Sequence, residues 1–249
     1  LWLQRNAITP LPLSIFASLG NLTFLSLQWN MLRVLPAGLF AHTPCLVGLS
    51  LTHNQLETVA EGTFAHLSNL RSLMLSYNAI THLPAGIFRD LEELVKLYLG
   101  SNNLTALHPA LFQNLSKLEL LSLSKNQLTT LPEGIFDTNY NLFNLALHGN
   151  PWQCDCHLAY LFNWLQQYTD RLLNIQTYCA GPAYLKGQVV VTVEAQVEAG
   201  KATGPGSWGD TKTTSCHFPP AHGVRPRDEE DGILLTSHGS PLPSRKARP

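Results

Sequence analysis

The stretch "LRSLMLSYNAITHLPAGIF", residues 70–88, contains a spacing of leucine, asparagine and phenylalanine that recurs along most of the chain. Leucines at 70, 73 and 75 precede Asn78, and Phe88 follows ten residues after it. The asparagines recur every 24 residues, at Asn6, Asn30, Asn54, Asn78, Asn102, Asn126 and Asn150, and the phenylalanines at Phe16, Phe40, Phe64, Phe88, Phe112 and Phe136. A fixed period of this kind predicts an internal repeat in which each unit packs against its neighbours.

The leucines of each repeat predict a short strand that buries one of its faces. In the pattern LxL, apolar residues alternate with variable ones, so one side of the strand enters the core and the other stays outside. The complete pattern, LxxLxLxxN, resembles the leucine-rich repeat. This resemblance implies an α/β solenoid of the horseshoe type, with a parallel sheet on its concave side and the phenylalanine register on its convex side. It also implies a ladder in which the asparagines hydrogen-bond backbone groups of adjoining coils.

The repeats occupy residues 1–150, and their two ends differ. "LWLQRN" at residues 1–6 is the strand part of a repeat already under way, so we expect a longer natural chain with further coils and a signal peptide upstream. "NPWQCDCHLAYLFNWL" at residues 150–165 predicts an apolar lid over the final coil, because its large residues recur at helical spacing. These are Trp152, Leu158, Leu161, Phe162, Trp164 and Leu165. We assign residues 151–190 to a partial cap.

The cysteines number five, at Cys45, Cys154, Cys156, Cys179 and Cys216. The phrase "NPWxCDC" resembles the C-terminal flanking cap of extracellular leucine-rich-repeat proteins, and this resemblance implies a disulfide between Cys154 and Cys179. Cys156 then needs a partner further along, for which Cys216 is a candidate, and the sequence leaves this pairing open. A competing interpretation takes Cys154, Cys156 and His157 as metal ligands, although structural zinc sites use two pairs of ligands. We expect Cys45 to be a half-buried thiol.

The last part of the chain, residues 191–249, is rich in Gly, Pro and Ser and predicts a low-complexity, disordered tail. Three Asn-x-Ser/Thr sequons, at Asn21, Asn103 and Asn114, together with the cap cysteines, favour a secreted glycoprotein. A membrane helix needs roughly 18 consecutive apolar residues. The sequence contains no such window, so we expect no membrane span.

Charge and motif content exclude two broad classes of function. The 16 basic and 17 acidic residues give a formal charge of −1, so nucleic acid is not an expected partner. We find no HExxH, no GxSxG, no phosphate-binding glycine loop and no clustered pair of acids. The sequence therefore predicts a protein that is not an enzyme and has no cofactor, metal or catalytic residue of its own.

Binding through the concave side is the use that the variable strand positions favour. Counting back from each repeat asparagine, these positions carry aromatic and neutral residues and no acidic one. The candidate partner-binding residues are Phe24, Trp29, His53, Met74, Tyr77, Lys96, Tyr98 and Lys125. A band of aromatics through Phe24, Trp29, Tyr77 and Tyr98 is typical of the centre of a protein interface. The alternative is that these rings only cover one another.

The cap stretch at residues 150–188, together with coils containing "LPAGIF", resembles the family of the non-catalytic large subunit of carboxypeptidase N. This resemblance implies a glycosylated plasma protein that acts as a regulatory subunit. It would bind and stabilise the carboxypeptidase N catalytic subunit, which is a secreted zinc enzyme and would hold the metal. The alternative is an extracellular adhesion or receptor-type ectodomain that binds another protein.

Overall fold

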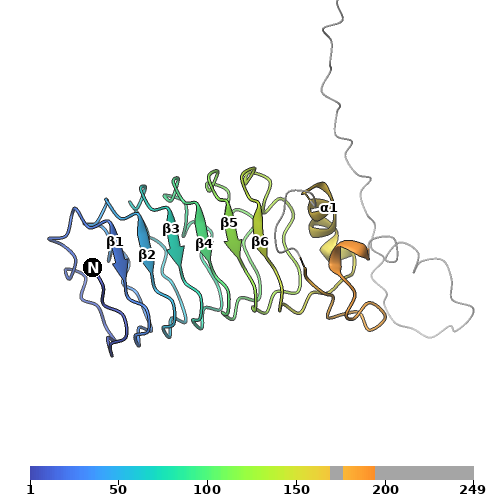
Figure 1. Ribbon diagram of the computed structural model, residues 1–249, viewed down its shortest axis with the longest axis horizontal. Coiled ribbons are helices and arrows are strands. Elements are labelled where there is room, and N and C mark those ends of the chain that lie inside the picture. The colour runs from blue at the N-terminus through green and yellow to red at the C-terminus, as the bar shows by residue number, and fades with distance from the viewer. Residues whose placement is uncertain (169–175, 194–249) are drawn as a thin grey trace, which may run out of the picture. The chain divides into compact units, whose positions relative to one another are not determined.

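The computed structural model of the chain describes residues 1–168 and 176–193. Its sheet contains β1 (Phe24–Ser26), β2 (Gly48–Ser50), β3 (Ser72–Met74), β4 (Lys96–Tyr98), β5 (Leu120–Ser122) and β6 (Asn144–Ala146). The strands pair in chain order and are all parallel, as Figure 1 shows. Trp2 adds an isolated parallel bridge to Ser26 in front of β1.

The 24-residue period sets the register of the sheet. Leu25 lies opposite Leu49, and each later strand repeats the match through Leu145. These central leucines are at most 1% exposed, because neighbouring coils cover them on both sides. The prediction of a leucine-rich-repeat solenoid with a parallel sheet is therefore confirmed. Turns on the side opposite the sheet link successive coils. Among the described residues, the one α-helix lies in the cap.

The repeated phenylalanines form a buried stack, here called the phenylalanine spine, from Phe16 to Phe136. Neighbouring rings are nearly parallel, and their centroids are separated by 6.0 to 6.4 Å. Every ring in the spine is at most 2% exposed. The spine therefore gives each coil an apolar contact with the next, on the side of the coil opposite the sheet.

The repeat asparagines connect neighbouring coils through their side-chain amides. Asn102 donates from Nδ2 to the carbonyl oxygens of Leu75 and Leu99, both at 3.0 Å, and its Oδ1 accepts from the backbone N–H of Ile80 at 3.1 Å. Asn30, Asn54, Asn78, Asn126 and Asn150 make equivalent bonds to the preceding coil. Asn6 differs, because it is exposed and donates within its own coil to Leu3 and Gln4. In the other six positions the amide satisfies backbone groups that lack a sheet partner.

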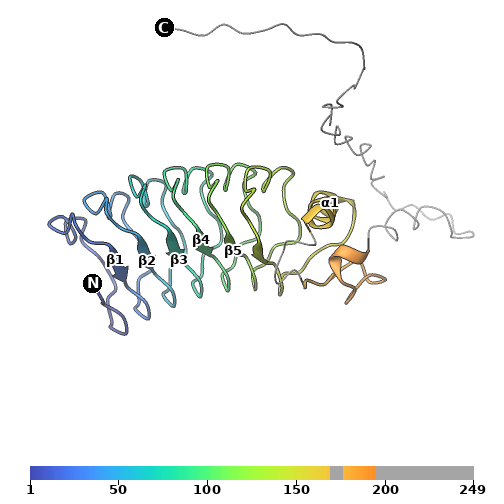
Figure 2. The same cartoon turned by 45° about the horizontal axis from the view of Figure 1, so that its top comes forward.

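The cap contains a short helix, α1 (Ala159–Tyr168), preceded by a 3-10 turn, η1 (Cys156–Leu158), and followed later by η2 (Val190–Thr192). Both views in Figures 1 and 2 place α1 beyond β6, at the end of the stack. Leu161, Phe162, Trp164 and Leu165 are its buried residues. The ring of Trp164 lies 5.0 Å from that of Phe136, so the helix extends the phenylalanine spine and shields its last member.

Two other aromatic residues attach the cap through hydrogen bonds. The buried indole of Trp152 donates from Nε1 to the carbonyl of Leu147 at 3.0 Å. The Tyr160 hydroxyl accepts from the backbone N–H of Phe136 and donates to Asp137, both at 2.9 Å. Burial is the main reason that the pKa of Tyr160 is raised above its usual value. The phenol therefore stays protonated and can keep both bonds.

A disulfide joins Cys154 to Cys179 across the cap, which confirms the predicted disulfide cap. Cys156 is also disulfide-bonded, and its candidate partner Cys216 lies outside the described residues, as does most of the predicted tail. The packed part of the cap continues to Val193, which is fully buried, so it extends three residues past the predicted boundary at 190. The expectation of a half-buried Cys45 is wrong, because this free thiol is exposed at the start of its coil.

Candidate functional site

The candidate site is the outward surface of the sheet, here called the concave face. It consists of the side chains six, four, two and one positions before each repeat asparagine, which form four rows across the coils. In β1 to β6 and the residues after them, the rows are Phe24, Gly48, Ser72, Lys96, Leu120 and Asn144; Ser26, Ser50, Met74, Tyr98, Ser122 and Ala146; Gln28, Thr52, Ser76, Gly100, Ser124 and His148; and Trp29, His53, Tyr77, Ser101, Lys125 and Gly149. The first coil contributes Trp2, Gln4 and Arg5.

The residues just before the asparagines have an unusual backbone conformation that positions their side chains. Trp29, His53 and Tyr77 have φ angles of 55°, 55° and 57°, in the left-handed region that most side chains avoid. Each still donates its N–H to the next coil, as Trp29 does to the Thr52 carbonyl at 3.0 Å. This bond continues the ladder past the end of the strand, so the same side-chain position in successive coils is held in line.

Trp29, His53 and Tyr77 therefore form a second ring stack, here called the edge stack, along the carboxyl edge of the sheet. The centroids of Trp29 and His53 are 3.6 Å apart with 9° between planes, and those of His53 and Tyr77 are 4.2 Å apart with 10°. The facing ring surfaces cover each other, but Trp29 and Tyr77 are each 49% exposed. The exposed parts of the stack include ring edges that carry N–H and O–H donors.

A separate aromatic pair lies over the first strands. The rings of Trp2 and Phe24 are tilted and 4.9 Å apart. Phe24 extends across Gly48 of the next strand, where a Cβ atom would meet its ring at 2.5 Å. A side chain at position 48 would therefore displace Phe24, and glycine lets the ring lie flat against the sheet. Trp2 is 66% exposed and forms the outer part of this pair.

The structure thus divides the predicted aromatic band into separate groups. Phe24 belongs with Trp2, whereas Trp29 and Tyr77 are joined by His53, and Tyr98 makes no ring contact with another described residue. Sequence reasoning missed the part played by Trp2 and Gly48. The signal was present as an aromatic residue facing a glycine at the same position of the next repeat. Sequence reasoning also did not predict that His53 would stack between the rings of Trp29 and Tyr77.

The remaining candidates lie on the middle and later coils. Lys96 and Tyr98 are on the same face of β4, next to Met74 on β3, which pairs with Tyr98 in register. Lys96 is exposed, while Met74 and Tyr98 are half-buried. Lys125 follows β5, and a Cβ atom at Gly149 in the next coil would lie 3.0 Å from its Cγ. Met74 shares its coil with Tyr77, and Lys96, Tyr98 and Lys125 lie on the next two coils toward the cap.

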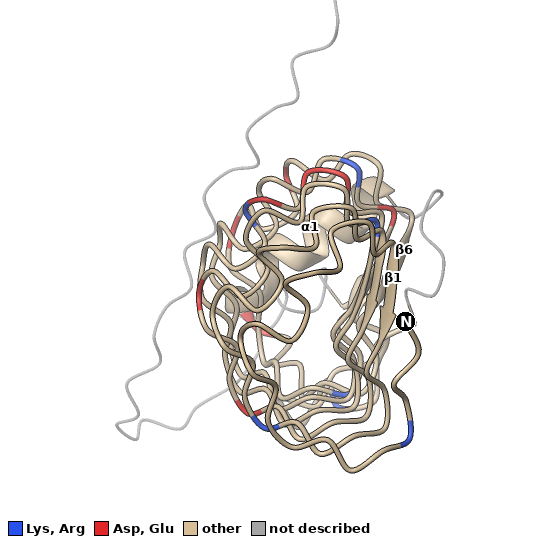
Figure 3. Cartoon of the chain, turned by 90° about the vertical axis from the view of Figure 1, so that its left-hand side faces the viewer, with Lys and Arg blue, Asp and Glu red and all other residues tan. Residues whose placement is uncertain are grey.

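The opposite edge of the sheet is charged and internally paired. There Lys117 and Arg71 both contact Glu93. A second set of pairs lies in the turns around the phenylalanine spine, where Arg89 is 3.9 Å from Glu61 and 3.5 Å from Asp90. The hydrogen bond from Lys117 is the main cause that lowers the pKa of Glu93 below its usual value. In Figure 3, viewed from the N-terminal end, the acidic segments lie along the turns outside the strands.

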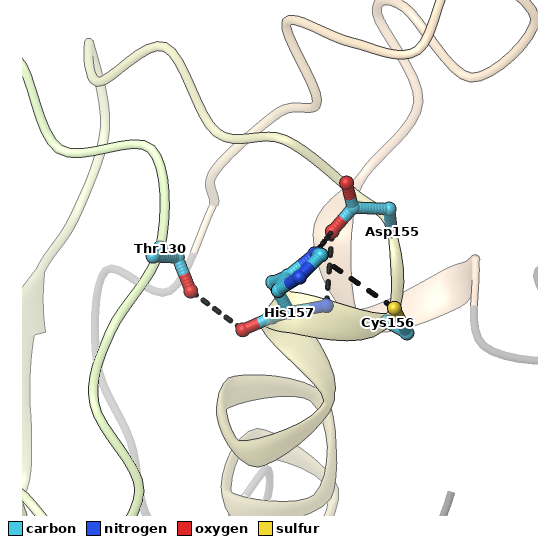
Figure 4. A network of polar contacts seen from close by, with 4 residues as sticks. All are labelled: Thr130, Asp155, Cys156 and His157. Atoms are coloured by element: carbon cyan, nitrogen blue, oxygen red, sulfur yellow. Dashed lines mark hydrogen bonds and ion pairs between the residues drawn. The ribbon is translucent and has the colours of Figure 1, made fainter. Parts of the chain in front are cut away.

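The cap holds a small polar cluster of Asp155, Cys156 and His157, shown in Figure 4. The Asp155 carboxylate accepts from the backbone N–H of His157 at 2.9 Å, which is an N-cap for η1, and lies 3.1 Å from Nδ1 of the same residue. Thr130 of the repeats donates to the His157 carbonyl. The sulfurs of Cys154 and Cys156 are both in disulfides, so neither is a thiolate ligand, and capping accounts for the arrangement.

The three sequon asparagines, Asn21, Asn103 and Asn114, are exposed. Nδ2 of Asn114 donates to the carbonyl of Arg89 at 3.0 Å, a bond that a glycan on this nitrogen would alter. Asn103 follows the ladder residue Asn102 directly and lies beyond the four rows of the concave face. None of the three belongs to those rows.

Comparison with known proteins places the repeats in a defined group. The profile of a family described as leucine rich repeat matches residues 1–56, 46–104 and 92–151. Carboxypeptidase N subunit 2 of Mus musculus is 67% identical over 60 residues, which cover 24% of this chain and 11% of that protein. Platelet glycoprotein Ib beta chain of Homo sapiens is 37% identical over 64 residues, which cover 25% of this chain and 31% of that protein.

A third relative, phospholipase A2 inhibitor of Gloydius brevicaudus siniticus, is 37% identical over 57 residues, or 17% of its length. The chain thus matches at most 31% of the length of these three relatives. Within the described residues, no helix is long and apolar enough to cross a membrane.

Proposed function

The chain belongs to the leucine-rich repeat family, and from this premise we propose that it is a secreted, non-catalytic subunit that binds and stabilises a zinc carboxypeptidase catalytic subunit. The observation that carries the proposal is the 67% identity over 60 residues to a protein named as a subunit of carboxypeptidase N.

The concave face supplies the docking surface in this proposal. Most of its side chains lie outside the core, because the leucines between them fill the interior, although Ser26 and Ser50 are buried. Trp29 and Tyr77 are exposed aromatic residues held in place by stacking, which lowers the entropy lost when a partner binds. Aromatic residues are also enriched among the side chains that contribute most to protein interfaces. The catalytic metal and the reaction belong to the partner.

The experiment combines the secreted chain with the catalytic subunit of carboxypeptidase N and measures two quantities. The first is complex formation by surface plasmon resonance, and the second is the half-life of carboxypeptidase activity at body temperature. A complex that prolongs the half-life supports the proposal. Absence of a complex, with a chain whose thermal melt shows that it is folded, contradicts it.

A matched pair of variants then tests the docking surface. Trp29→Ala and Tyr140→Ala both remove an exposed aromatic side chain, but Tyr140 lies outside the four rows and is 75% exposed. We expect Trp29→Ala to weaken the complex about tenfold or more, and Tyr140→Ala to leave it unchanged. Equal losses in both variants would place the docking surface elsewhere on the chain.

A second candidate function is an extracellular adhesion or receptor-type ectodomain. The observation that favours it is the 37% identity over 64 residues to a platelet glycoprotein chain. This function predicts that the chain binds a cell-surface protein and has no effect on carboxypeptidase half-life. Cell-binding assays with the fluorescently labelled chain, run beside the carboxypeptidase assay, distinguish the two functions.

A further inference from the structure

We propose that the concave face receives an acidic segment of its protein partner, whose carboxylates contact Lys96 and Lys125 on the two coils that follow the edge stack. This inference rests on the proposed use of the concave face for protein binding, and it specifies the chemistry of the segment that docks there. Three features of the described residues support it: the absence of acids from the face, the absence of partners for its lysines, and the donors of the edge stack.

The four rows of the concave face contain no aspartate or glutamate between Trp2 and Gly149. The described acidic residues lie instead in the turns, in the cap and at the opposite edge of the sheet, such as Glu61, Glu93 and Asp155. The chain as a whole is nearly neutral, with a formal charge of −1. The separation of charge is therefore a property of this face and does not reflect a basic protein.

Two groups among the basic side chains of the described residues differ in their partners, and Arg5, Arg33 and Lys186 belong to neither. Arg71, Arg89 and Lys117 contact carboxylates of the chain itself. Lys96 and Lys125 are exposed, and neither forms an ion pair with another described residue. A lysine whose charge is not compensated within its own chain attracts a carboxylate from outside, and such complementarity guides both orientation and association rate.

The edge stack adds neutral donors to these charges. The indole Nε1 of Trp29 and the phenol oxygen of Tyr77 make no hydrogen bond with other described residues, and the stacking holds both rings in fixed positions. Tyr98, next to Lys96 on the same face of β4, offers another hydroxyl. Carboxylates accept hydrogen bonds from all of these groups, and charged acceptors form the stronger bonds.

An acidic protein segment fits this surface better than a polysulfated or polyphosphate chain does. Polyanions are held by runs of basic side chains, each of which neutralises one repeating charge. Here the two lysines lie on different coils among serines, with Tyr98 on the same strand face as Lys96 and the edge stack on the preceding coils. That mixture suits a peptide in which a few carboxylates alternate with apolar or aromatic side chains.

The test uses the full chain and a random copolymer of glutamate and tyrosine as the probe, with a copolymer of lysine and tyrosine as the opposite-charge control. We expect binding to the acidic copolymer that weakens with added salt, and no binding to the basic one. Heparin is added as a competitor. Unlabelled acidic copolymer serves as the reference competitor. If heparin displaces the bound copolymer at a lower concentration than this reference does, the site prefers a polyanion and the proposal is overturned.

Two matched sets of variants locate the binding site. Lys96→Gln combined with Lys125→Gln is expected to weaken binding of the acidic copolymer about tenfold. Lys117→Gln combined with Lys186→Gln removes the same charge from surfaces outside the four rows, and should change binding less than about twofold. Equal losses in the two sets, or an unaffected Lys96 and Lys125 double variant, would overturn the proposal.

The same variants separate this inference from the proposed function. If the chain binds the carboxypeptidase catalytic subunit and the Lys96 and Lys125 double variant binds it equally well, the proposed function stands and the acidic-segment inference fails. If the double variant loses the copolymer and neither protein binds the catalytic subunit, the inference stands and the identity of the partner is wrong.

Discussion

The chain contains two ladders of nearly parallel rings that differ in burial, residue type and spacing. The phenylalanine spine is buried, uses one residue type in every coil and has ring spacings of 6.0 to 6.4 Å. The edge stack uses Trp29, His53 and Tyr77, extends over three coils and is spaced at 3.6 and 4.2 Å. A ladder that recurs with the period belongs to the fold, whereas one built from variable positions is available for binding.

The largest effect is expected from breaking the spine. Phe88→Ala removes a ring that is 1% exposed and contacts Phe64 and Phe112, so it leaves a cavity between coils. Such substitutions cost about 3–5 kcal/mol, and because coils stabilise their neighbours the loss should spread along the repeats. Urea unfolding followed by circular dichroism measures it. A cost below about 1 kcal/mol would mean that the spine contributes little to stability.

The asparagine ladder is the second repeated element, and Asn102→Ala should cost about 2–4 kcal/mol. The variant leaves the carbonyls of Leu75 and Leu99 and the N–H of Ile80 without their partner in a buried place. Asn6→Ala is the matched control, because Asn6 is exposed and bonds only within its own coil. Unfolding curves for the two variants should differ clearly. Similar losses of unfolding free energy in Asn102→Ala and Asn6→Ala would show that the hydrogen bonds between coils add no stability.

Trp29→Ala is expected to have a small effect on stability and a large one on binding. The exposed ring loses its contact with His53, which is worth about 0.5–1.5 kcal/mol. Thermal melts and partner-binding curves on the same preparation measure the two effects. We expect the two variants to rank in opposite orders. Phe88→Ala should lower the melting temperature more, and Trp29→Ala should weaken partner binding more at a temperature where both variants are folded. A melt shift as large as that of Phe88→Ala would assign Trp29 to the fold.

The smallest effect concerns the charged edge of the sheet and its dependence on pH. The pKa of Glu93 is lowered in the folded chain, chiefly by Lys117, so its contribution to stability is present above the usual value of 4.5. That contribution is lost as the pH falls through the lowered pKa. Lys117→Gln should therefore reduce the urea midpoint slightly at neutral pH and not at strongly acidic pH. Because both Glu93 and Lys117 are in contact with solvent, added salt should reduce the difference.

Some corrections came from contacts between residues in different coils. Cys45 was expected to be half-buried because it comes shortly before a strand. It is exposed, as is Val47 two residues later, because this segment lies at the edge of the sheet where the strands begin. The aromatic band through Phe24, Trp29, Tyr77 and Tyr98 was read from their common exposure on strands. The structure separates them because they belong to different rows. Phe24 lies six positions before its asparagine and Tyr98 four, whereas Trp29 and Tyr77 lie one position before theirs.

What the sequence by itself determined is the repeat and everything that shares its period. The 24-residue spacing of leucine, asparagine and phenylalanine specifies parallel strands in register, a spine and a ladder, because each coil must bury the same face against an almost identical neighbour. The cap followed from its cysteines and helical spacing. These features depend on patterns within a single repeat or a short segment, which can be read from one stretch of chain.

Only the tertiary structure decided how the variable side chains meet. The edge stack exists because a left-handed φ angle just before the asparagine recurs in successive coils, and because the backbone bonds after each strand keep those positions aligned. The placement of Phe24 over Gly48 likewise depends on the register between two strands. Such contacts join residues that are 24 positions apart and have no common pattern, so their geometry emerges only when the coils are stacked.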